Sequence, residues 1–215
     1  MRDELMVSTP IGAARVVADL AVRARWTLVL GHGAGGGVEA RDLAAIASAL
    51  PARRVSVLRV EQPWRVAGGR VAPAPARLDL AWRAVLAELA GQRPAWTEGR
   101  LVVGGRSAGA RVACRTALST GAAAVLALAF PLHPPGRPGA SRAEELLGTG
   151  LPTLVVQGER DPFGRTEQLP GGPRSVAIPY ADHGFSVPRR APLTQIEALK
   201  LITDAVARWL ARLPG

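Results

Sequence analysis

The sequence predicts an α/β fold, with a mostly parallel sheet of about eight strands and helices on both faces. Short runs rich in Val, Leu and Ile alternate with helical patterns along the chain. Most of these runs are apolar throughout, which is typical of strands buried on both faces of a parallel sheet. The length of 215 residues fits one domain, so we expect a single domain over residues 1–215.

The elements follow one another in a regular order. An opening hairpin is expected from strands at 5–8 and 14–18. Further strands are expected at 27–30, 55–60, 100–103, 124–129, 153–156 and 175–178. Helices are expected at 38–50, 76–90, 111–118, 143–147 and 192–210. In the last helix we expect one apolar face, made of Ile196, Leu199, Ile202, Val206 and Trp209. The Pro- and Gly-rich segment 131–150 leaves the carboxyl end of a strand, where it could form a small lid.

Composition excludes several classes of protein. The net charge of +10 comes from scattered arginines, with Lys200 as the only lysine. No basic run carries interleaved aromatic residues, so we expect no specific nucleic-acid partner. No apolar run reaches the roughly 20 residues of a membrane span, and acidic residues near Met1 argue against a signal peptide. We therefore expect a cytoplasmic protein, in which the single Cys114 is a small buried apolar group.

A glycine-rich segment after the strand at 100–103 contains a candidate nucleophile. Gly105, Ser107 and Gly109 form a Gly-x-Ser-x-Gly motif between that strand and the next helix. A sharp strand-to-helix turn exposes such a serine hydroxyl at the end of the strand. Side chains at the flanks of this turn would collide, which favours glycine two residues before and two after the serine. The motif predicts that Ser107 is a nucleophile.

A serine hydroxyl needs a base, and the base needs a third group that orients it. His183 follows the last expected strand, and Asp161 follows the strand before it. The chain order serine, acid, histidine, each at a strand's carboxyl end, is that of an α/β-hydrolase triad. We expect Asp161 to orient His183, with Glu159 and Asp182 as competing acids.

A second glycine-rich loop, Gly31–Gly37, follows the third expected strand. Acyl transfer places negative charge on a carbonyl oxygen, and two backbone N–H groups must point at it. We expect these donors to be Ala34, with Gly33 as the alternative, and Ala108, which follows the nucleophile. His32 is interpreted as a structural residue of the loop.

The same loop also matches a dinucleotide-binding pattern. Gly31, Gly33 and Gly36 form Gly-x-Gly-x-x-Gly after a strand and before a helix, and Glu61 ends the next strand. Two strands precede this loop, however, whereas the fingerprint usually marks the first strand of its unit. It also leaves the three expected triad residues unexplained, so a dinucleotide-binding oxidoreductase is a distant alternative.

Several segments resemble a known group of proteins. They are the loop His32–Gly36, the turn Gly104–Ser107, the segment Pro131–Pro135, and the surroundings of Asp161 and His183. Over nearly the whole chain, the sequence resembles small α/β-hydrolase-like proteins of the KANSL/Tex type, related to dienelactone-hydrolase-like enzymes. It departs from them at Ala108–Ala110, where the family often has Met-Gly-Gly. The resemblance implies an α/β-hydrolase fold with little or no lid and a serine-hydrolase site, and it implies no particular substrate.

We therefore predict a serine hydrolase that cleaves a carboxylic ester or related acyl bond of a small molecule through an acyl-enzyme. The alternative is a non-catalytic interaction protein on a hydrolase fold. No metal or cofactor is expected, because no His, Asp, Glu or Cys cluster has the spacing of metal ligands. The expected substrate-binding residues are Gly33, Trp64, Leu132, His133 and Phe185, with Phe130 beside them, although they are equally interpreted as ordinary core or rim residues.

Overall fold

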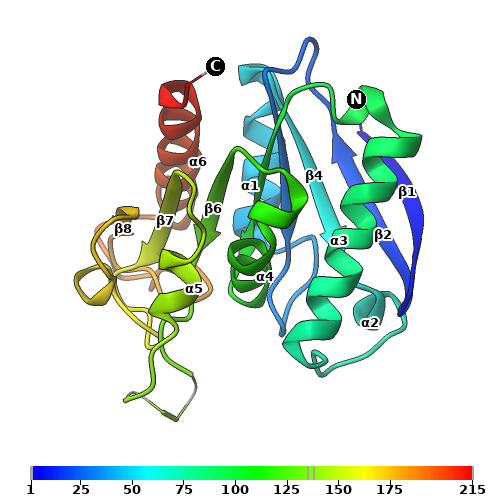
Figure 1. Cartoon of the computed structure of the whole chain (residues 1–215). Coiled ribbons are helices and arrows are strands. Elements are labelled where there is room, and N and C mark those ends of the chain that lie inside the picture. Colours follow the sequence, from blue (N-terminus) through cyan, green and yellow to red (C-terminus); the bar gives the residue numbers. More distant parts are fainter. Residues whose placement is uncertain (1, 135, 138, 215) are drawn as a thin grey trace.

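A computed structural model of the chain describes residues 2–134, 136–137 and 139–214 (Figure 1). Its strands are β1 (Arg2–Thr9), β2 (Gly12–Asp19), β3 (Trp26–Gly31), β4 (Val55–Glu61), β5 (Arg100–Arg106), β6 (Ala124–Leu128), β7 (Thr153–Gly158) and β8 (Arg174–Ile178). Its helices are α1 (Arg41–Ala49), α2 (Pro63–Val66), α3 (Pro75–Gln92), α4 (Ala108–Thr116), α5 (Ala143–Leu147) and α6 (Gln195–Arg212). Within these ranges, no helix is both long and apolar enough to cross a membrane.

The strands form one eight-stranded sheet in the order β1-β2-β4-β3-β5-β6-β7-β8. The hairpin β1–β2 is antiparallel, as expected, and β2 is also antiparallel to β4. All other neighbouring strands are parallel. The predicted mostly parallel sheet is confirmed, and the carboxyl ends of β3 to β8 consequently lie along one edge.

Helices cover both faces of this sheet (Figure 1). Alternate strand residues such as Val29 and Val103 pack with α3 and α4 in one buried apolar cluster. The intervening residues, such as Leu28 and Val102, pack with α1 and α6 in the other. Because both faces are covered, the central strands β3 and β6 are almost wholly apolar, which is the pattern seen in the sequence.

Two details differ from the sequence-based expectation. The loop after β4 contains the short helix α2, which begins at Pro63. Ile196 does not belong to the buried face of α6, because its side chain is 80% exposed. At 100° per residue it lies about 120° around the helix from the buried Ile202. The buried face begins at Ala198 and continues through Ile202, Val206 and Trp209, with Leu199 partly buried against the same cluster.

Cys114 is buried on α4, as expected. Burial raises the pKa of its thiol to about 12, so the thiol stays neutral at physiological pH. Cys114 thus serves as a small packing residue.

Candidate active site

Ser107 lies at the junction between β5 and α4, in an uncommon backbone conformation. Its φ is +54° and its ψ is −111°, a region that side-chain-bearing residues rarely adopt. A Cβ added at Gly105 would lie 2.5 Å from the carbonyl oxygen of Gly31, and one at Gly109 would lie closer still. The expected need for glycine at both flanks of the turn is therefore met. Such strain is characteristic of functional sites.

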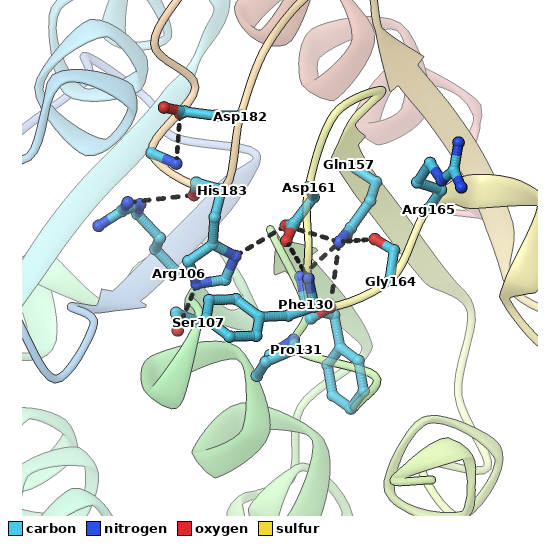
Figure 2. A network of polar contacts seen from close by, with 12 residues as sticks. Arg106, Ser107, Phe130, Pro131, Gln157, Asp161, Gly164, Arg165, Asp182 and His183 are labelled. Carbon is cyan, nitrogen blue, oxygen red and sulfur yellow. Dashed lines mark hydrogen bonds and ion pairs between the residues drawn. The ribbon is translucent and has the colours of Figure 1, made fainter. Parts of the chain in front are cut away.

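The structure brings Ser107, His183 and Asp161 together in one line (Figure 2). The Ser107 Oγ lies 2.9 Å from His183 Nε2, and His183 Nδ1 lies 2.7 Å from Asp161 Oδ2. When the Nδ1–H donates to the carboxylate, Nε2 is left to accept the hydroxyl proton of Ser107. The residues come from the loops after β5, β7 and β8, which meet at the same edge of the sheet.

The two competing acids are engaged elsewhere. The Glu159 carboxylate accepts the backbone N–H of Tyr180 at 2.8 Å. Asp182 accepts the backbone N–H groups of Gly184 and Ser186 at 2.7 and 2.8 Å, which closes a tight turn. Of the three candidate acids, Asp161 is the one that contacts the His183 ring.

Gln157, which the sequence pattern did not single out, contacts the carboxylate of Asp161. Its Nε2 donates to Asp161 Oδ2 at 2.8 Å and lies 2.7 Å from the Gly164 carbonyl oxygen. Its Oε1 accepts the backbone N–H of Phe130 at 2.9 Å. The backbone N–H of Phe163 donates a hydrogen bond to the other carboxylate oxygen of Asp161, at 2.8 Å. A buried glutamine at the end of the otherwise apolar β7 was the available signal.

Arg106 is a second residue that the sequence pattern did not single out. Its Nη2 donates to the backbone carbonyl oxygen of His183 at 3.1 Å (Figure 2). Its Nε lies 3.7 Å from the carboxylate of Asp42, which is fully buried at the start of α1. Burial raises the pKa of Asp42, and the positive charge of Arg106 opposes this shift. Arg106 thus links the turn of the nucleophile, the loop of the base and α1.

The glycine loop after β3 passes directly beside the nucleophile. A Cβ at Gly33 would lie 3.3 Å from the Cβ of Ser107. Among the described residues, neither the N–H of Ala34 nor that of Ala108 has a hydrogen-bond acceptor. Both residues also line one cavity.

His32 fixes the start of this loop. Its Nδ1–H donates to the Gly33 carbonyl oxygen at 2.8 Å, and its Nε2 accepts the N–H of Gln62 at 3.1 Å. Burial lowers its pKa, which keeps the ring neutral in this arrangement. The contacts of His32 with Gly33 and Gln62 fit a structural role for this residue, as expected.

Glu61, the acid of the dinucleotide pattern, forms an ion pair with Arg15 at 2.9 Å.

The expected substrate-binding residues divide into two groups. Gly33 lies against Ser107, and Trp64 lines the cavity that contains Ala34 and Ala108. Leu132 and Phe185, with the neighbouring Phe130, are instead buried in the two apolar clusters and do not line this cavity. Large apolar side chains at strand ends fill the core, and the sequence pattern did not separate them from lining residues. His133 lies in the loop after β6, where its Nδ1–H donates to the Ala140 carbonyl oxygen at 2.9 Å.

Comparison with known proteins agrees with this architecture. Residues 24–211 match a protein-family model described as an alpha/beta hydrolase domain. Among curated protein sequences, none matches the chain.

Several solved structures share the fold. XC6422 from Xanthomonas campestris, described as an α/β serine hydrolase without lid, has a TM-score of 0.72 and 23% identity, with 100% of this chain and 96% of that chain covered. Dienelactone hydrolase from Anabaena variabilis has a TM-score of 0.75 and 18% identity, covering 100% and 99%. Est1E from Butyrivibrio proteoclasticus, solved with ferulic acid bound, has a TM-score of 0.72 and 16% identity, covering 97% and 98%.

Proposed function

We propose that this chain, which belongs to the alpha/beta hydrolase domain family, is a serine hydrolase that cleaves carboxylic esters or related acyl compounds. The observation that carries this proposal is the unbroken line from Ser107 Oγ through His183 to the buried carboxylate of Asp161, with contacts of 2.9 and 2.7 Å. A hydroxyl, an imidazole and a carboxylate in this order have the geometry of an activated nucleophile.

In the first half-reaction, Ser107 Oγ attacks the carbonyl carbon of the ester while its proton passes to His183 Nε2. The new Oγ–C bond gives a tetrahedral intermediate, whose negative oxygen is held by the N–H groups of Ala34 and Ala108. Asp161 stabilises the imidazolium that forms. When the intermediate collapses, the C–O bond to the alcohol breaks, and the alcohol leaves with the proton from Nε2.

In the second half-reaction, water replaces the alcohol. His183 Nε2 takes a proton from water, whose oxygen attacks the acyl carbon attached to Ser107. Collapse of this second intermediate returns the proton to Ser107 Oγ and releases the carboxylic acid. The free N–H groups at Ala34 and Ala108 support the same oxyanion site in both halves.

The substrate we propose is a small molecule with an ester or thioester bond. Est1E, which shares the fold, is described with ferulic acid bound, and this makes a small organic acid a reasonable product class. We also propose that the chain is related to proteins of the KANSL/Tex type and to dienelactone-hydrolase-like enzymes. This relationship rests on the motifs around Ser107 and His183.

A fluorophosphonate probe tests the proposal, because it forms a covalent adduct only with an activated serine. We expect the wild type to gain the mass of one adduct and Ser107→Ala and His183→Ala to gain none. Ser119→Ala removes an exposed serine outside the site and is expected to label like the wild type. If the folded wild type remained unlabelled, the hydrolase proposal would be wrong, and a non-catalytic interaction protein would become the preferred function.

A further inference from the structure

A narrow cavity lies beside the candidate oxyanion site. Its lining includes Ala34 and Ala108, whose backbone N–H groups have no acceptor among the described residues. Buried side chains of α3 and α4 also line it, namely Leu78, Trp82 and Val112. Trp64 and Ala72, from the loop between β4 and α3, form its outer wall. The cavity walls are apolar.

The position of the cavity relative to His183 decides which part of an ester it can hold. The oxygen of the leaving alcohol must receive its proton from His183 Nε2, so the alcohol lies on the His183 side of the reacting carbon. Among the described residues, none from the loops that carry Asp161 and His183 lines this cavity. Its lining comes from the glycine loop, the β4–α3 segment, α3 and α4, which fits the acyl side of the reacting carbon.

The width of the cavity limits the length of that chain. The cavity has room for about one water molecule, which is about the size of a methyl group. A longer chain would have to displace the indole of Trp64, which packs on the ring of His32 with 5.6 Å between ring centroids. Because His32 is itself held by Gly33 and Gln62, this wall is braced.

We infer that this cavity is the acyl pocket of the enzyme and that it selects esters of short aliphatic acids, acetyl or propionyl, with Trp64 as the residue that sets the limit. The inference rests on the proposed serine-hydrolase function and specifies the acid part of its substrate. It does not constrain the alcohol.

The test is a series of p-nitrophenyl esters that differ only in the acyl chain: acetate, butyrate and octanoate. For the wild type we expect kcat/KM on octanoate to be at least about tenfold lower than on acetate, because a closed pocket discriminates by this factor or more per misfitting methylene. Trp64→Ala opens the wall and is expected to raise the butyrate-to-acetate ratio of kcat/KM by about tenfold. Trp64→Phe, which keeps an aromatic wall, is expected to retain the wild-type order.

A second variant tests the pocket from the opposite direction. Ala72→Leu adds bulk at the outer wall, in a loop residue that is only partly buried, and is expected to lower kcat/KM on butyrate more than on acetate. A wild-type rate that is flat or rises from acetate to octanoate would overturn the inference, as would unchanged chain-length ratios in a folded Trp64→Ala or Ala72→Leu protein. Fluorophosphonate labelling separates the two proposals: a labelled wild type with a flat profile contradicts only the pocket, whereas an unlabelled wild type contradicts both.

Discussion

Gln157 Nε2 lies 2.8 Å from Asp161 Oδ2, the same carboxylate oxygen that accepts the Nδ1–H of His183. Gln157 is fully buried, and its Oε1 is occupied by the N–H of Phe130. The orientation of the candidate acid is therefore determined by the end of β7 and by the loop that follows β6. A buried carboxylate is costly unless fixed donors satisfy it, and Gln157 is one of those donors.

We expect Gln157→Leu to lower kcat on p-nitrophenyl acetate by about tenfold or more with little change in KM, because a hydrogen bond to a charged group is worth about 1.5–3 kcal/mol. Loss of the partner of Phe130 N–H is expected to lower the free energy of unfolding by about 1–3 kcal/mol. Steady-state kinetics and urea denaturation measure the two effects. Gln92→Leu, at the exposed end of α3, is the matched control and should change neither. A raised KM with unchanged kcat would contradict a role in positioning Asp161.

The backbone strain at Ser107 predicts a conflict between stability and activity. Ser107→Gly and Ser107→Ala both remove the hydroxyl, but only glycine tolerates the φ of +54° without strain. We expect the glycine variant to be about 1 kcal/mol more stable than the alanine variant, and both to be inactive. Chemical denaturation measures the difference. At Ser119, which has an ordinary φ, glycine should instead be less stable than alanine, and the same order at both positions would contradict the strain.

Burial of His32 predicts a dependence of stability on pH. Its pKa is lowered from the ordinary value of 6.5, so the folded protein binds fewer protons at this ring than the unfolded chain does. Stability from this group is present above pH 6.5 and is lost as the pH falls below that value. We expect His32→Gln, which can keep both hydrogen bonds, to show a shallower loss of unfolding free energy between about pH 6.5 and 5. Gln92→Leu, at the exposed end of α3, removes no titratable group and is the control that should keep the wild-type slope.

The sequence was sufficient to predict those site residues that directly follow a strand. Ser107, Asp161 and His183 each follow a recognisable strand, and a parallel sheet necessarily brings the carboxyl ends of its strands to one edge. Gln157 and Arg106 could not be assigned in this way, because their partners Phe130 and Asp42 come from distant segments.

The same limit applies to the apolar residues near the site. Leu132 and Phe185 lie next to site residues in the sequence, but packing decides whether an apolar side chain at a strand end lines a cavity or fills the core. Trp64 and Leu132 are both large apolar residues that follow a strand, and only the three-dimensional arrangement separates the wall of the cavity from the core. Helical periodicity likewise placed Ile196 on the buried face of α6. Its spacing from Leu199 suits that face, but its side chain is exposed.

The contact between Arg106 and the His183 backbone predicts that the loop carrying His183 is held in place by Arg106 as well as by Asp161. Its Nη2 holds the carbonyl oxygen of His183 at 3.1 Å, so Arg106→Met is expected to lower kcat about tenfold by loosening that loop. It also leaves the buried Asp42 without its counter-charge, which is expected to cost about 3–5 kcal/mol of unfolding free energy. Arg190→Met, an exposed arginine outside the site, should change neither quantity.

The double variant Asp42→Asn/Arg106→Met separates these two effects. Replacing the carboxylate with an amide removes the uncompensated buried charge, so most of the lost stability is expected to return. The tether to the His183 carbonyl oxygen remains absent, and kcat is therefore expected to stay about tenfold below the wild type. Recovery of kcat together with stability would instead show that Arg106 acts only through the fold. Stability recovered without kcat would identify Arg106 as a residue that positions the base.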